Sequence, residues 1–177
     1  PVHSGRVLFF GRINPYKGAD NLLEIVRMCP EIQFDVIGRV DPQTQNVVEQ
    51  LSREKNVKLK NDYVTDEEMR KAFSDCDWVI VPYNSASQSG IIIDAYKYSR
   101  PVIAFAVGAI PEQVDDEKSG YLVKAGENEM FAQRLKEVMK LDMEKYDKMS
   151  RNAYAYGQEK YAASGAVDRF IRLLYDN

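Results

Sequence analysis

The sequence Val7-Leu8-Phe9-Phe10-Gly11-Arg12-Ile13-Asn14-Pro15-Tyr16-Lys17-Gly18 joins a short apolar run to a loop that carries two cations. The apolar run predicts a buried strand. After the loop, apolar side chains recur at the spacing of one helix face, at Leu22, Ile25, Val26 and Cys29. A strand, loop and helix in this order build an open parallel sheet, whose ligand crevice is formed by the loops at the carboxyl ends of its strands.

A second unit of the same kind begins at Trp78-Val79-Ile80-Val81-Pro82 and continues into the loop Ser85-Ala86-Ser87-Gln88-Ser89-Gly90. The helical pattern after this loop carries Asp94. Main-chain amides at the start of such a helix favour phosphate, and a carboxylate accepts hydrogen bonds from vicinal hydroxyls. Because Arg12 and Lys17 suit a diphosphate and Asp94 suits a ribose, the two loops together predict a nucleotide site.

Each loop taken alone also has a plainer interpretation. The first is equally compatible with a connection that carries two solvated cations, and the second with a helix cap followed by an exposed acid at Asp94. The order Lys17-Gly18-Ala19 excludes a Walker A loop, which needs Ser or Thr after the lysine. The three-glycine dinucleotide fingerprint and the Gly-x-Ser-x-Gly elbow are absent from the sequence, and its single histidine is His3.

Short apolar runs alternate with helical patterns along the whole chain. We expect strands at 6–10, 33–37, 57–60, 77–82, 101–105 and 120–124. This alternation predicts the α/β class, as a Rossmann-like doubly wound parallel sheet of about six strands flanked by helices. The length of 177 residues fits one domain.

Three further helices are expected. Thr65 with Glu68 forms a capping box before a helix that reaches about Ser74. Two apolar stripes predict the others, at Phe131, Leu135, Val138 and Met139, and behind a Ser164 cap at Val167, Phe170, Ile171 and Leu174. The charged, tyrosine-rich stretch 142–162 is expected to be a surface helix on the rim.

Composition narrows the classes of function. The net charge of -3 argues against a nucleic-acid binder, and the nearly uninterrupted apolar stretch 102–110 is shorter than the roughly 20 residues of a transmembrane helix. Cys29 and Cys76 fall on apolar helix faces, which favours free thiols, and one histidine leaves no soft-ligand metal site. Because the chain starts without Met or a signal peptide, we expect a piece of a longer cytoplasmic protein.

With both loops in place, the chain resembles the C-terminal, donor-binding half of the GT-B-fold retaining glycosyltransferases of family four (glycosyl transferases group 1). The family pattern Gly-Arg-x4-Lys-Gly is matched by Gly11, Arg12, Lys17 and Gly18. The matches continue in the family's order over nearly the whole chain, at Val36-Ile37-Gly38, Asp75-Cys76-Asp77-Trp78, Pro82-Tyr83, Arg100-Pro101-Val102-Ile103, Gly108-Ala109-Ile110-Pro111-Glu112 and Gly120-Tyr121-Leu122-Val123.

The resemblance implies that a nucleoside-diphosphate sugar is bound and its glycosyl group is transferred with retention, without a catalytic metal or another cofactor. Arg12 and Lys17 are then the catalytic residues that hold the departing diphosphate. The implied substrate-binding residues are Gly11, Ser87, Gln88, Ser89, Gly90 and Asp94, with the base near Gly38, Arg39, Tyr63 and Val64. Asp94 replaces a family glutamate that holds the ribose, whereas the family glutamate that touches the donor sugar falls at Ala86.

Residues 1–177 are accordingly expected to be the nucleotide-sugar-binding C-terminal domain, inactive on its own because the N-terminal acceptor domain is absent from this chain. The expected partners are the nucleoside-diphosphate sugar and that N-terminal domain, and any peripheral membrane contact is expected through the missing half. Two alternatives stay open. One is a non-catalytic Rossmann-like nucleotide-binding or interaction module, and the other is half of a sugar-nucleotide epimerase.

Overall fold

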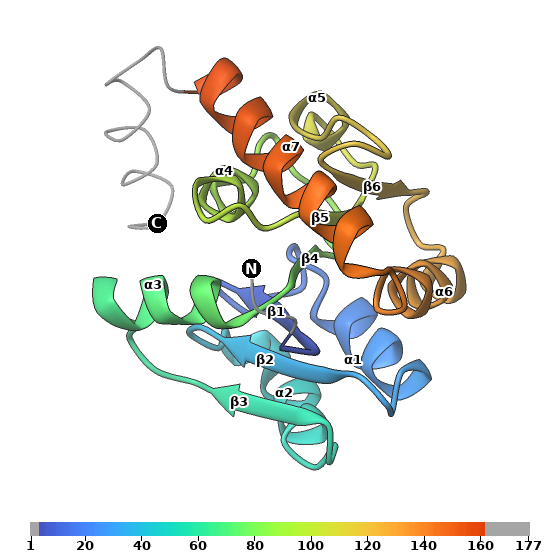
Figure 1. The fold of residues 1–177 in the computed structure, drawn as a ribbon. Coiled ribbons are helices and arrows are strands. Elements are labelled where there is room, and N and C mark those ends of the chain that lie inside the picture. Colours follow the sequence, from blue (N-terminus) through green and yellow to red (C-terminus); the bar gives the residue numbers. More distant parts are fainter. Residues whose placement is uncertain (1–3, 162–177) are drawn as a thin grey trace.

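A computed structural model of the chain describes residues 4–161, in which a parallel sheet lies between two layers of helices (Figure 1). The strands are β1 (Arg6–Phe10), β2 (Gln33–Ile37), β3 (Val57–Lys60), β4 (Trp78–Val81), β5 (Val102–Phe105) and β6 (Gly120–Val123). Their order is β3-β2-β1-β4-β5-β6, and all neighbours are parallel. The predicted fold class and strands are confirmed, with differences only at strand ends.

Helices cover both faces of this sheet. They are α1 (Ala19–Met28), α2 (Gln45–Leu51), α3 (Asp66–Asp75), α4 (Gly90–Lys97), α5 (Ile110–Gln113), α6 (Asn128–Val138) and α7 (Met143–Tyr161), with a short 3-10 helix at Pro42–Thr44. Helix α1 packs against α2 and α6 on one face, and α4 packs against α7 on the other (Figure 1). None of the helices within residues 4–161 is long and apolar enough to cross a membrane.

The predicted capping box of α3 and the predicted apolar stripe of α6 are both present in the structure. The Thr65 hydroxyl accepts a hydrogen bond from the Glu68 amide at 3.2 Å, and the Glu68 carboxylate accepts one from the Thr65 amide at 3.0 Å. Helix α6 buries Phe131, Leu135 and Val138. The predicted stripe from Val167 to Leu174 and its Ser164 cap lie outside the described residues, as does His3.

Helix α7 confirms the predicted helix but not its place on the rim. Tyr146, Met149 and Ala153 are buried, and the helix packs along α4. The Tyr146 hydroxyl donates to the Asp77 carbonyl oxygen at 2.8 Å. Most of α7 is exposed or half-buried, as expected of a surface helix, but its buried positions recur every three or four residues and form an apolar stripe within a mostly charged sequence.

The two cysteines belong to the core. Cys29 and Cys76 are free and buried, at the ends of α1 and α3, as predicted. Burial raises the pKa of Cys29 to about 11 and the pKa of Cys76 to about 12. Both thiols are therefore protonated at neutral pH and are poor nucleophiles.

The strand order reverses between β1 and β4. From β1 the chain moves outward to β2 and β3, and it then returns to β4 on the other side of β1. The loops that follow β1 and β4 therefore leave the same edge of the sheet from adjacent strands. This switch point is where open parallel sheets bind ligands.

Candidate functional site

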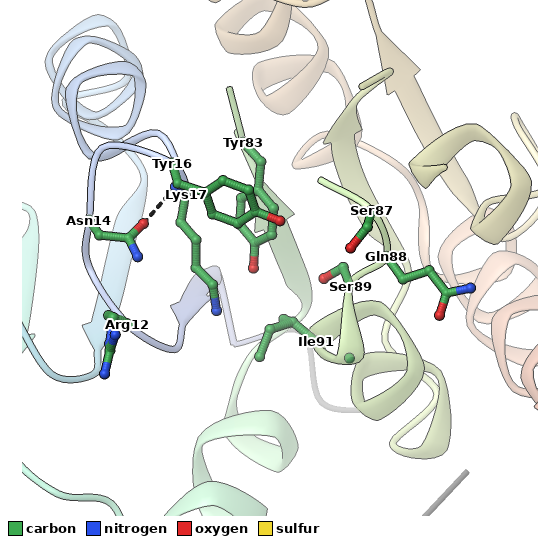
Figure 2. A pocket seen from close by; sticks show the side chains of 10 residues that line it. Arg12, Asn14, Tyr16, Lys17, Tyr83, Ser87, Gln88, Ser89 and Ile91 are labelled. Carbon is green, nitrogen blue, oxygen red and sulfur yellow. Dashed lines mark hydrogen bonds between the residues drawn. The ribbon is translucent and has the colours of Figure 1, made fainter. Parts of the chain in front are cut away.

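The loops after β1 and β4 border one cavity of about 290 Å³ (Figure 2). It is lined by Arg12, Asn14, Tyr16, Lys17, Tyr83, Ser87, Gln88, Ser89, Gly90 and Ile91. The structure thus brings together the predicted residues of both loops, which are Arg12, Lys17 and the run from Ser87 to Gly90. The lining carries two cations and no carboxylate, so its charge favours an anionic ligand.

Two asparagines tie these loops together. The Asn84 side chain donates to the Pro15 carbonyl oxygen at 2.8 Å, and the Asn84 amide donates to the Tyr16 carbonyl oxygen at 3.0 Å. The Asn21 side chain donates to the Pro82 carbonyl oxygen at 2.9 Å and to the Asn84 side chain at 2.8 Å. The sequence analysis missed both residues, because an asparagine gives no local sign of a partner more than sixty residues away.

Gly18 lets α1 begin against the end of β4. Its φ of 73° lies in the left-handed region, and a Cβ added there would overlap the Pro82 carbonyl oxygen. A side chain at this position is therefore excluded by backbone conformation and by space at once. The glycine brings the two loops to within hydrogen-bonding reach of each other.

Three amides at the start of α1 are used within the turn that precedes it. The Asn14 side chain accepts a hydrogen bond from the Lys17 amide at 2.8 Å. The Gly18 amide donates to the Pro15 carbonyl oxygen at 3.1 Å, and the Ala19 amide donates to the Asn14 carbonyl oxygen at 3.3 Å. These three amides are therefore not available to a ligand, and Lys17 contributes its side chain to the cavity.

The start of α4 supplies the main-chain donors instead. The buried Gln113 side chain accepts from the Ser89 amide at 2.7 Å and donates to the Ser89 carbonyl oxygen at 3.1 Å. The Ser89 amide is therefore already used by the protein. Gly90 and Ile91 line the cavity, and their amides lie in the first turn of α4, where a helix offers no internal acceptor. The positive end of the α4 dipole thus adjoins the cavity.

Lys17 is a partly buried cation beside these donors. Burial, and then the nearby charge of Arg12, lower the pKa of Lys17 to about 8. Its ammonium nitrogen lies 5.6 Å from the centre of the Tyr83 ring. Among the ion pairs of residues 4–161, none involves Lys17. A cation held partly out of water without a counter-charge is suited to an anionic ligand.

Gly11, Gly38 and Arg39 lie beside the cavity without lining it. A Cβ added at Gly11 would lie 3.0 Å from the Lys17 ammonium nitrogen, and a Cβ added at Gly38 would overlap the Gly11 carbonyl oxygen. The Arg39 carbonyl oxygen accepts from the Ile13 amide at 2.8 Å, while the Arg39 side chain is exposed. The loop after β2 is thus packed against the loop after β1.

Tyr63 and Val64 follow β3 at the same edge of the sheet. Tyr63 is 82% exposed and Val64 is half-buried, and neither lines the cavity. The structure therefore offers an accessible aromatic face one loop further out. Its role toward a base stays a prediction.

Asp94 lies within α4 and does not line the cavity. Its side chain is 4% exposed, and its carboxylate lies 3.5 Å from the Lys97 ammonium nitrogen. Asp94 is therefore not the exposed acid of the plainer interpretation. Its contact with a ribose also stays a prediction.

Comparison with protein families identifies the group to which the chain belongs. The family described as Glycosyl transferases group 1 matches residues 3–156. The chain belongs to this family. Membership confirms the resemblance drawn from the sequence, and the epimerase alternative loses its support.

Two curated relatives of this glycosyl transferases group 1 chain are glycosyltransferases. A D-inositol 3-phosphate glycosyltransferase of Segniliparus rotundus is 33% identical over 127 residues, which are 66% of this chain and 28% of that protein. A GDP-mannose:glycolipid 4-beta-D-mannosyltransferase of Xanthomonas campestris pv. campestris is 32% identical over 104 residues, 56% of this chain and 30% of that protein. The chain spans about a third of the length of the curated relatives it matches.

Solved structures share the fold. The C-terminal domain of a glycosyl transferase group 1 family protein from Francisella tularensis superposes with a TM-score of 0.77 at 22% identity, over 90% of this chain and 87% of that chain. Anabaena HepE in complex with UDP superposes with a TM-score of 0.79 at 22% identity, over 97% of this chain and 49% of that chain.

Proposed function

We propose that this chain is the donor-binding domain of a glycosyl transferase, and that it holds a nucleoside-diphosphate sugar with the diphosphate in the cavity between the two loops. The observation that carries the proposal is the cavity itself: Arg12, Lys17 and the start of α4 meet at the switch point of the sheet, without a carboxylate in the lining. The solved complexes of Anabaena HepE with UDP and with UDP-glucose support it.

The reaction places negative charge on the group that leaves. When the bond between the sugar and the diphosphate breaks, the electron pair goes to the diphosphate. Lys17, Arg12 and the amides at the start of α4 stabilise that charge, which fixed cations and dipoles do well in a cavity partly closed to water. In this proposal no metal ion is required, because the cations supply its electrostatic role. Retention of the anomeric configuration rests on the family resemblance alone.

The acceptor belongs to a second domain in this proposal. The chain matches about a third of the length of its curated relatives, which supports a donor half that works with an N-terminal half. Alone, the chain binds the donor weakly and does not transfer it, because one wall of the cleft is missing and water stays in the site. Two buried free cysteines fit a cytoplasmic location for the whole protein.

The remaining predicted contacts complete the proposed donor site. Asp94 accepts hydrogen bonds from the ribose hydroxyls, and the base lies near Gly38, Arg39, Tyr63 and Val64. Gln88 and Ser87, on the exposed side of the cavity, face the donor sugar in place of the family glutamate that falls at Ala86.

Titration of the chain with UDP, GDP and ADP tests the proposal. We expect one of them to raise the melting temperature and to bind with a Kd of roughly 10⁻⁵–10⁻³ M, about 4–7 kcal/mol. In the Asp94→Asn variant, affinity for the ribonucleotide should fall more than affinity for its 2′-deoxy analogue, which has fewer hydroxyls to lose. Binding of none of the three would contradict the proposal and favour a non-catalytic interaction module.

A further inference from the structure

Two buried hydroxyl groups at the cavity have no hydrogen-bond partner. Tyr83 is 2% exposed and Ser89 is 3% exposed, and neither the Tyr83 Oη nor the Ser89 Oγ atom is paired. A buried hydroxyl without a partner is costly, and folded proteins seldom keep one. Figure 2 shows both oxygen atoms directed into the space between the two loops. Lys17 lies on one side of this space and the start of α4 lies on the other.

Two buried tyrosines elsewhere in the fold, Tyr96 and Tyr146, have partners for their hydroxyls, whereas the Tyr161 hydroxyl at the end of α7 has none. The Tyr96 hydroxyl lies 2.8 Å from the Ser119 hydroxyl, and the Tyr146 hydroxyl donates to the Asp77 carbonyl oxygen at 2.8 Å. Neither Tyr96 nor Tyr146 lines the cavity. What distinguishes the unpaired hydroxyl of Tyr83 is that this residue lines the cavity, where a bound ligand supplies the partner that the protein does not.

The surroundings of these hydroxyls select an anionic acceptor. Burial raises the pKa of the Tyr83 phenol, so Tyr83 is a neutral donor at pH 7. The Lys17 ammonium nitrogen lies 5.6 Å from the Tyr83 ring, and the amides of Gly90 and Ile91 adjoin the same cavity. All of these groups donate, and the lining has no carboxylate to accept from them. A phosphate oxygen, which accepts hydrogen bonds and carries negative charge, complements this set of donors.

We infer that the Tyr83 and Ser89 hydroxyls donate to a phosphate oxygen of a ligand held between Lys17 and the start of α4. The inference rests on the proposed function and deepens it, because it adds Tyr83 to the residues that contact the diphosphate. Lys17 has a long side chain and no ion pair among the described residues, so it can turn toward the anion and admit an oxygen to the two hydroxyls.

Titration with inorganic pyrophosphate, followed by amide NMR shifts of the 177-residue chain, tests the inference without assuming a base. Tyr83→Phe keeps the ring and deletes the hydroxyl. We expect about 10-fold weaker pyrophosphate binding, the effect of one hydrogen bond to a charged group, and an unliganded melting temperature that is unchanged or higher. Adding Ser89→Ala should weaken binding further.

The matched control is Tyr96→Phe. It removes a buried hydroxyl that has a partner, so it should lower the melting temperature and leave pyrophosphate affinity unchanged. The two variants therefore differ in the result expected for the melting temperature and in the result expected for the pyrophosphate affinity. A structural role for the Tyr83 hydroxyl would instead give Tyr83→Phe the behaviour of this control.

The affinity decides the inference, because it is measured on folded protein. Pyrophosphate binding that is equal in the wild type and in both Tyr83→Phe variants overturns it, as does a wild type that binds no pyrophosphate. If a nucleoside diphosphate binds and Tyr83→Phe has no effect, the inference fails and the proposed function stands. If pyrophosphate binding depends on Tyr83 and no nucleoside diphosphate binds more tightly, the inference stands and the proposed function fails.

Discussion

At the scale of one residue, the buried charge of Lys17 lowers the stability of the free chain. Burial first, and Arg12 second, lower its pKa from an ordinary 10.5 to about 8. The unfolded chain therefore holds this proton more tightly than the folded chain. Below about pH 8 the charge opposes folding, and that cost is relieved as the pH rises from about 8 to 10.5. This sign is opposite to that of a lysine held in an ion pair.

Replacing Lys17 with Met should stabilise the free chain at pH 7. After allowance for solvent screening, we expect the free energy of unfolding to rise on the order of 1 kcal/mol. The gain should shrink as the pH approaches 10.5, where both states lose the proton. Urea denaturation at several pH values measures it, with the exposed Lys140→Met as the control. A loss of stability at pH 7, or a gain that grows toward pH 10, would contradict the assignment.

At the scale of elements, the two helices that adjoin the cavity have different roles. The start of α1 is closed by the Asn14 turn, so this element contributes only its flanking cation. The start of α4 is held from outside by Gln113, which leaves the amides of Gly90 and Ile91 to a ligand. Gly18 sets how closely α1 approaches β4, and it is the position where this packing is most sensitive.

Gly18→Ala should therefore destabilise the chain more than a glycine substitution that meets only backbone strain. We expect about 3 kcal/mol or more, since strain at positive φ and overlap with the Pro82 carbonyl add. Gly126 is the matched control: its φ is 80°, nothing lies within 4 Å of an added Cβ, and Gly126→Ala should cost about 1–2 kcal/mol. Equal losses in urea denaturation would show that the contact with Pro82 is unimportant.

At the scale of the whole molecule, strand order determines where the site forms. Because β1 and β4 are neighbours, two loops about seventy residues apart in sequence share one cavity. In the proposed function, the second domain closes over this cavity. Donor binding and glycosyl transfer are therefore separable in the proposed function.

The 177 residues alone should consume no donor in the presence of any acceptor. Adding the N-terminal half, or using the full-length protein, should restore transfer, because closure of the two halves excludes water from the leaving diphosphate. In the full-length enzyme, Lys17→Ala should lower kcat by about 10²–10³, the cost of one charge-stabilising donor. Robust transfer by the isolated chain would remove the two-domain proposal.

The sequence by itself determined the elements, their order and the two loops that meet. The strand at 6–10 contains the continuous apolar run Val7-Leu8-Phe9-Phe10, and the Thr65–Glu68 box marks a helix start from side chains three residues apart. These signals are local in the chain and independent of packing, so they can be read without a structure. The two cations Arg12 and Lys17 in the loop after the first strand are also a local signal that can be read from the sequence.

Only the tertiary structure decided which polar groups at the site are used and which are free. Gln113 takes the Ser89 amide, and Asn84 takes the Pro15 carbonyl, across separations of 24 and 69 residues. Likewise, the Tyr83 hydroxyl is unpaired because the packed elements place no hydrogen-bond partner next to it. A hydrogen bond between distant residues depends on how the elements pack, which no local pattern encodes, and the low pKa of Lys17 depends on burial that exists only once the loops have met.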